Sequence, residues 1–309
     1  MAHLWNCFWE ACGNRVRLTP LLIERFVLAK LYFDPRGLLV AMDNDRAVGF
    51  AHAGFGPRTE EKVLDPTVGV IAAFVVPPGP IRREVMQVLL SAAEEYLRIH
   101  GASVIFFGGS SFPEPFWLGL AYGPRLPGVA DNDLELREFL AEVGYQPVES
   151  RVVLERSLRQ FTVTVTPELV RCHRELTVNF TGEPLLSNWW ELTTLDPFEL
   201  LSFELVTRIG NCRVGRMRLF IREMAANPAG CYPIALWDID LVGTCPLSEA
   251  KWFFLQQATR ELARGNAATL EIQVSWPIGQ PEPTDLAHLR TLLGMTPRFQ
   301  GTVFRKDLL

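Results

Sequence analysis

The chain has 309 residues, of which 48% are hydrophobic and 21% charged, enough for two cores of ordinary size. Its formal net charge of −5 disfavours a general nucleic-acid role, because such domains usually carry a basic face. No apolar run is as long as a membrane span, and the N-terminus lacks the pattern of a signal peptide. The cysteines and histidines show no metal-binding spacing. We therefore expect a cytoplasmic protein with no metal site and no nucleic-acid or membrane partner.

The first half opens with a helical region over 5–32, interrupted near Asn14 and Pro20. Two short apolar runs around a polar turn then predict a β-hairpin over 37–53. The rest is predicted as a strand (68–76), an amphipathic helix (82–100), a strand (103–107), a long loop, a helix (134–143) and a strand (148–154).

The second half repeats this order after a less regular start. Its opening segments are extended or mixed (176–180, 200–209, 216–223), and they lead to a strand (232–242), a helix (248–264), a strand (268–274), a helix (285–293) and a strand (302–305). The order of the last four elements is the same in both halves.

Two segments of the sequence recur at fixed offsets. Residues 144–147 (GYQP) correspond to 294–297 (GMTP) at an offset of 150, and Leu89-Leu90 corresponds to Phe254-Leu255 at an offset of 165. A period this long indicates paired domains rather than short repeats. We predict a boundary near 158–166, with one domain over 1–158 and a second over 159–309.

The order of hairpin, strand, helix, strand, helix and strand resembles the GNAT superfamily of acyl-CoA-dependent N-acyltransferases. The resemblance is strongest over 33–41, over 75–96 and from 116 through 145. It implies an α/β (α+β) fold of two tandem GNAT-like domains, each with a mixed central sheet flanked by helices. It also implies acetyl-CoA or another acyl-CoA as co-substrate, and a small-molecule or peptide amine as acceptor.

In GNAT proteins the backbone of a bulged strand polarises the acyl carbonyl, and the next loop and helix N-terminus hold the coenzyme's pyrophosphate. Unpaired N–H donors at a helix N-terminus suit such an anion. The resemblance implies this carbonyl-polarising role for Phe74, Val75 and Val76 in the first half. In the second half it implies the same role for Leu241 and Val242.

The coenzyme loops depart from the family pattern, which has glycine or another small residue before the helix. The first loop has none there, although Arg82 and Arg83 could bind phosphate as charge-assisted donors. In the second loop Ser248 and Ala250 fit the small-residue positions, and Ser248 would cap the helix. A register shift of one residue would instead place Glu249 there. Either loop is a working coenzyme site or a relic.

The tyrosine that often serves as general acid in the family is absent from both halves, where Leu140 and Arg290 stand instead. Tyr122, in the long loop, is the candidate substitute. Asp238 and Asp240 lie two residues apart, hence on one face of a strand, and paired carboxylates can raise a pKa as a general base requires. The alternative is that they pair with nearby arginines.

Two functions remain open from the sequence. The first is N-acyl transfer from acyl-CoA to a primary amine. The alternative is a non-catalytic, degenerate GNAT scaffold that binds a ligand or a protein partner. We also expect an exposed edge of the first sheet to be covered by the linker 161–165, or by a neighbouring chain in a homodimer.

Overall fold

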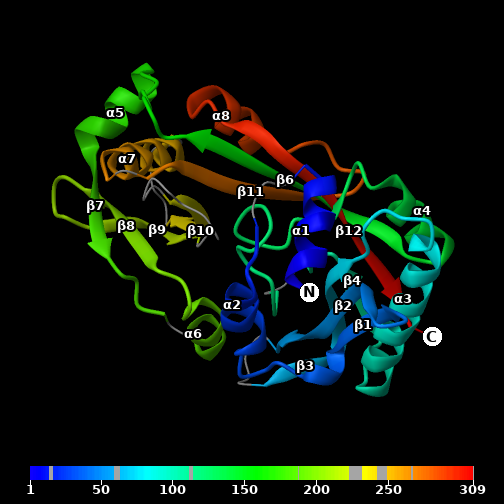
Figure 1. The fold of residues 1–309 in the computed structure, drawn as a ribbon. Coiled ribbons are helices and arrows are strands. Elements are labelled where there is room, and N and C mark those ends of the chain that lie inside the picture. The colour runs from blue at the N-terminus through cyan, green and yellow to red at the C-terminus, as the bar shows by residue number, and fades with distance from the viewer. Residues whose placement is uncertain are drawn as a thin grey trace.

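The strands of the protein form one continuous mixed sheet. The structure is a computed structural model that describes residues 1–13, 17–58, 63–110, 114–186, 188–222, 232–241, 249–265 and 267–308. Its 12-stranded sheet has the order β1-β2-β3-β4-β12-β6-β11-β10-β9-β8-β7, with β5 added beside β12 (Figure 1). The predicted mixed sheet flanked by helices is therefore confirmed.

The first half follows the sequence prediction closely. Its helices are α1 (Ala2–Ala11), α2 (Pro20–Ile23), α3 (Arg82–Ile99) and α4 (Leu134–Glu142), with a π-helical turn at Glu24–Leu28 and a 3-10 turn at Pro35–Gly37. Its strands are β1 (Leu38–Asp43), β2 (Arg46–Pro57), β3 (Leu64–Val75), β4 (Val104–Phe107), β5 (Val129–Ala130) and β6 (Gln146–Ser157).

The second half contains two helices that we did not predict, α5 (Pro167–Glu175) and α6 (Trp189–Leu195). Each begins at a side-chain cap, where Thr166 accepts from the Leu169 N–H and Asn188 from the Glu191 N–H. The other elements are β7 (Leu176–Gly182), β8 (Leu200–Thr207), β9 (Arg213–Ile221), β10 (Pro233–Leu241), α7 (Ala250–Arg264), β11 (Thr269–Pro277), α8 (Thr284–Leu292) and β12 (Thr296–Asp307).

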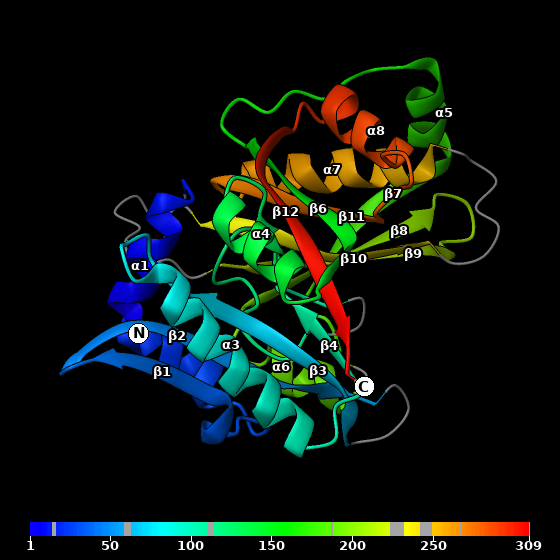
Figure 2. The same cartoon turned by 90° about the vertical axis from the view of Figure 1, so that its right-hand side faces the viewer.

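The helices divide between the two faces of the sheet. Helices α3 and α4 pack on one face of the first half, and α5, α7 and α8 pack on the second half (Figures 1 and 2). On the inner face, a single core cluster joins α1 and α2 to the long loop 114–128 and to residues of β9 and β10. We call the face of the sheet that this cluster covers the inner face. The cluster contains residues of both halves.

The last strand of each half pairs with a strand of the other. Strand β12 lies between β4 and β6, with Phe304 opposite Phe107, and β6 pairs with β11, with Glu155 opposite Glu271. Each half of the sheet is thus completed by a strand from the other half. The domain boundary near residue 158 stays a prediction. The structure shows that strands from both sides of this position pair in one sheet.

The linker 161–165 does not cover a sheet edge, so this part of the expectation is wrong, and cover by a neighbouring chain stays a prediction. The Thr164 hydroxyl donates to the Leu292 carbonyl at 3.0 Å, and the Gln256 amide donates to the Thr164 carbonyl at 3.0 Å. The linker therefore lies against α7 and α8. It leads directly into α5, whose N-cap residue is Thr166.

Candidate active site

Strands β3 and β4 diverge in the first half, and we call this point the first splay. They pair in parallel only from Val68 opposite Val104 to Ile71 opposite Phe107. Ala72 is then the extra residue of a β-bulge in the pairing of β3 with β2. A bulge bends its strand and disrupts the local ladder. The first half thus has the bulged, diverging strand that the family resemblance implies.

Aromatic side chains of α1 close the first splay. Trp5, Phe8 and Trp9 are 2%, 8% and 7% exposed, and together with Phe74 and Val75 they line a pocket of about 40 Å³. Ligand pockets are usually on the order of 300–1,000 Å³. The space that remains is too small for the acyl arm of a coenzyme.

The first coenzyme loop offers little to a phosphate. Arg82 is 6% exposed, forms ion pairs with Asp133 (2.6 Å) and Glu135 (2.8 Å), and donates to the Val76 carbonyl at 3.0 Å. Arg83 forms an ion pair with Glu142. Three of the four residues at 77–80 are prolines, which have no N–H to donate. Both guanidinium groups are thus already engaged.

Strands β10 and β11 diverge in the same way in the second half, at the second splay. Their parallel pairing runs from Pro233 opposite Thr269 to Ala235 opposite Glu271, and Trp237 is then the bulged residue. Among the described strands, none pairs with the edge of β10 that faces β11 beyond Ala235. This edge includes the predicted residue Leu241, whereas Val242 lies outside the described residues.

The second coenzyme loop is described only at its end. Ser248 lies outside the described residues, and Glu249 is the N-cap residue of α7, without a side-chain capping bond. Ala250 is 0% exposed and packs in the core beneath α7. The side chain of Ala250 therefore faces the core, and a large residue at this position would disturb packing before it could test coenzyme binding.

The two candidate base residues of β10 differ in their surroundings. Arg218 binds Asp238 at 2.9 Å and also binds Glu191 at 2.8 Å. The hydrogen bond with Asp238, followed by that with Glu191, raises the pKa of Arg218 despite its burial. Asp240 is exposed near the end of β10, and the described residues give it no ion pair. Asp238 thus shares one arginine with a second carboxylate.

Tyr122 is a buried side chain with a fixed partner. Its hydroxyl donates to the Gly13 carbonyl at 2.8 Å, and its ring lies 5.2 Å from Phe299 and 6.3 Å from Trp9. Burial raises the pKa of Tyr122. The tyrosine is 4% exposed and joins the long loop to α1 and β12.

The long loop of the first half is fixed against the second half, which we did not predict. Arg222 is 1% exposed, donates to the Gly119 carbonyl at 2.9 Å and pairs with Glu271 at 2.6 Å. Glu271 also accepts from the Gly123 N–H at 3.1 Å. Both glycines have positive φ, +68° and +72°, which favours glycine. Two residues of the second half therefore hold the long loop of the first half.

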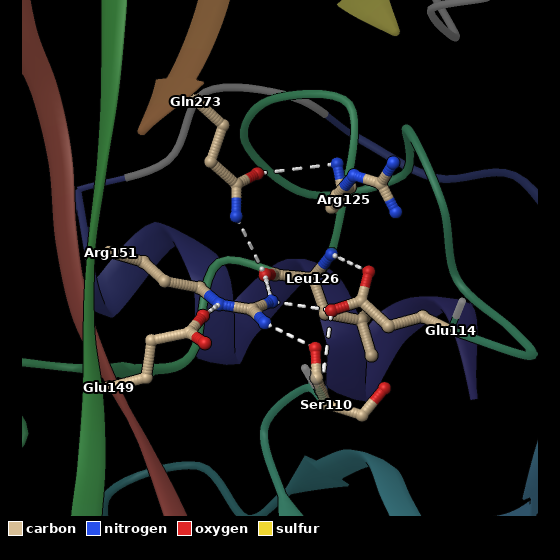
Figure 3. Close-up of polar contacts among 7 residues, drawn as sticks. All are labelled: Ser110, Glu114, Arg125, Leu126, Glu149, Arg151 and Gln273. Carbon is tan, nitrogen blue, oxygen red and sulfur yellow. Dashed lines mark hydrogen bonds and ion pairs between the residues drawn. The ribbon is translucent and has the colours of Figure 1, made fainter. Parts of the chain in front are cut away.

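A second buried arginine holds the same loop from β6 (Figure 3). Arg151 is 4% exposed and binds the carboxylates of Glu114 and Glu149 together with the carbonyls of Ser110 and Leu126. An arginine at an inward position of an apolar strand is the sequence signal that could have revealed this anchor.

Glu155 is a further half-buried carboxylate that sequence reasoning missed. It stands opposite Glu271 in the pairing of β6 with β11. Burial first, and the charge of Glu271 second, raise the pKa of Glu155. It lies on the inner face of the sheet, where its carboxylate also influences the hydroxyl of Tyr122.

Residues 1–111 match the family model described as the Acetyltransferase (GNAT) family. A GCN5-related N-acetyltransferase from Sphaerobacter thermophilus is 16% identical with a TM-score of 0.66, over 99% of this chain and 91% of that chain. A tandem GNAT protein from the clavulanic acid biosynthesis pathway is 15% identical with a TM-score of 0.57, over 99% and 94%.

A GCN5-related glucosamine N-acetyltransferase region of a fungal multi-domain GH3 β-N-acetylglucosaminidase is 15% identical, with a TM-score of 0.64. It is matched over 99% of this chain but only 36% of that chain. No curated protein matches the sequence. Likeness at this level of identity shows the fold alone. The chain carries a GNAT-family match over residues 1–111 and has, over nearly its full length, the fold of tandem GNAT proteins.

Proposed function

We propose that the protein is an N-acyltransferase that moves an acetyl or other acyl group from acyl-CoA to a primary amine, and that the second half holds the working site. One observation carries this proposal: the two halves share a splay and a bulge but differ in what surrounds them. Apolar rings of α1 fill the first splay, whereas Asp238, Arg218 and Gln273 lie near the second.

Acyl-CoA would supply an activated thioester. In the reaction the amine nitrogen forms a bond to the acyl carbon and the carbon–sulfur bond breaks. A base takes the proton of the amine and passes it to the sulfur, which leaves as a thiol. The N–H groups of β10 beyond Ala235 that face β11 would stabilise charge on the carbonyl oxygen. Asp238 is the candidate base, and Asp240 is the alternative.

The first half supports the second candidate function. Its splay is closed, and Arg82 and Arg83 are held in ion pairs. We propose that this half is a non-catalytic GNAT copy that contributes its long loop to the other half. If neither half transfers acyl groups, the whole chain is a scaffold.

Calorimetric titration with acetyl-CoA tests this assignment. Ser248→Glu should abolish binding by placing charge against the pyrophosphate, and the matched variant Arg83→Glu should leave the dissociation constant unchanged. A loss of binding in Arg83→Glu alone would move the site to the first half. No binding by the wild type at millimolar acetyl-CoA would support the scaffold.

A further inference from the structure

We propose that the acceptor amine carries an anionic group, a carboxylate or a phosphate, and that Arg125 binds this group beside the second splay. The inference rests on the proposed function and extends it to a class of acceptor. It starts from the position of one guanidinium group in the long loop.

The Arg125 guanidinium stacks on the residue that forms the second bulge. Its central carbon lies 4.3 Å from the ring centroid of Trp237. Trp237 is the extra residue between the Leu236 and Asp238 pairs of β10. A ligand anion bound by Arg125 would therefore lie about one side chain away from the strand edge that faces the acyl group.

The backbone of Arg125 is fixed without help from its side chain (Figure 3). Gln273 accepts from the Arg125 N–H at 3.3 Å and donates to the Leu126 carbonyl at 3.1 Å. The Leu126 N–H donates in turn to Glu114 at 3.1 Å. The guanidinium of Arg125 takes no part in this network, so the loop does not need it for support.

Arg125 differs in this respect from three buried arginines that hold the long loop or bind Asp238. Arg151, Arg218 and Arg222 are 4%, 5% and 1% exposed, and each pairs with at least one carboxylate. Arg125 is half-buried, and no carboxylate within the described ranges pairs with it. Ring stacking pre-orients the planar guanidinium, which suits two-point binding of a carboxylate or phosphate.

The bound anion would belong to the acceptor rather than to the coenzyme. Trp237 packs against the core cluster of the inner face. The first turn of α7, where the resemblance places the pyrophosphate, packs through Ala250 and Phe253 in the core of the opposite face. An anion at Arg125 therefore approaches the second splay from the side opposite the coenzyme.

Matched acceptors test the proposal on the full-length protein. We would compare 4-aminobutyrate, 3-aminopropyl phosphate and butylamine with acetyl-CoA, and measure thiol release. The anionic acceptor should have a kcat/KM at least about tenfold higher than butylamine, since charge-assisted hydrogen bonds are among the stronger polar contacts. Arg125→Gln should remove this preference through KM, leaving butylamine turnover and acetyl-CoA affinity unchanged. Arg83→Gln, an exposed arginine of the first half, is the control variant.

The outcomes separate this inference from the proposed function. Equal turnover of all three acceptors, or equal losses for all in Arg125→Gln, would overturn the inference and leave acyl transfer intact. If none of the three acceptors leads to thiol release, calorimetric titration with 4-aminobutyrate and 3-aminopropyl phosphate decides whether the anion site exists. Binding that Arg125→Gln abolishes would support the anion site while acyl transfer fails, and no binding would overturn both. Preference for one of the two anions identifies the group.

Discussion

Ala72 and Trp237 occupy equivalent positions in the two halves of the chain. Each is the extra residue of a bulge just beyond the parallel pairing with the neighbouring strand, one residue after Ile71 and two residues after Ala235. They lie 165 residues apart (237 − 72). This is the offset that relates Leu89 to Phe254 in the sequence. The positions of the two bulges therefore fit the duplication that the sequence indicates. The side chains differ in size, because Ala72 is small and Trp237 offers a large ring on which Arg125 stacks.

Removal of a ring from the first splay should destabilise the protein and open a cavity. Trp9→Ala deletes a side chain that is 7% exposed, at an expected cost of about 3–5 kcal/mol in unfolding free energy. The enlarged pocket is apolar, so indole should bind it and raise the melting temperature of the variant but not that of the wild type. An equal response of both proteins to indole would contradict the filled splay.

The two halves should not be separable as independent folded fragments. A fragment over 1–158 lacks β12, which pairs with both β4 and β6. We expect it to aggregate, because unpaired strand edges recruit other chains. Extension to residue 175 should not help, since it adds no strand beside β4. Co-expression with 159–309 should restore a soluble heterodimer by size-exclusion chromatography, and a monomeric, cooperatively unfolding 1–158 would refute the prediction.

The Arg151 anchor should dominate the stability of the long loop. Arg151→Met leaves Glu114, 1% exposed, as an unpaired buried charge, and breaking a buried pair costs about 3–5 kcal/mol. Arg305→Met removes an exposed pair with Asp307 and should change the unfolding free energy by only about 0–1 kcal/mol. Chemical denaturation measures both. Similar values for the two variants would show that the buried network is dispensable.

Glu155→Gln should stabilise the protein near neutral pH. The folded-state pKa of Glu155 is raised above its unfolded value. Between these two pKa values the folded state binds more protons than the unfolded state, so stability falls as pH rises from the unfolded to the folded pKa. The amide removes the like charge opposite Glu271, which is worth about 0.2–1 kcal/mol. Denaturation at pH 5 and pH 8 should show a larger gain at the higher pH. Destabilisation at pH 8 would mean that Glu155 forms a favourable pair instead.

Local sequence patterns predicted the repeated elements because those elements are amphipathic over many residues. Helix α3 buries Val85, Leu89 and Ala93 on one stripe, and the sequence placed it to within one residue of its end. Helix α6 was missed because its 7 residues are too few to show a helical period, and α5 was missed although Thr166 marks its start.

The pairing of strands across the halves could not be predicted from the sequence. Strand β4 is a continuous apolar run, and its composition fits β6 as well as β12 as a neighbour. The ion pairs of the candidate site could not be predicted from the sequence either. Arg82 meets Asp133, and Arg222 meets Glu271, each across a long sequence separation, so neither partner could be named before the fold was known.

Acid should destabilise the protein through His52, which is fully buried beside the long loop. Its Nδ1 accepts from the Trp117 indole N–H at 3.0 Å, and its Nε2 has no partner among the described side chains. Burial lowers the pKa of His52 to about 3, against the usual value of about 6.5. Between these values the unfolded state binds the extra proton, so the unfolding free energy should fall as pH decreases, by up to about 1.4 kcal/mol per pH unit.

His52→Gln tests this effect because its side-chain carbonyl can still accept from Trp117 but cannot titrate. Denaturation at pH 6.5 and pH 5, above the range where most carboxylates titrate, should show a smaller loss of stability in the variant than in the wild type. His3→Gln, at an exposed position of α1, should keep the wild-type slope. If His52→Gln and wild type lose the same free energy between these two pH values, His52 takes up its proton in the folded state, and the burial argument is wrong.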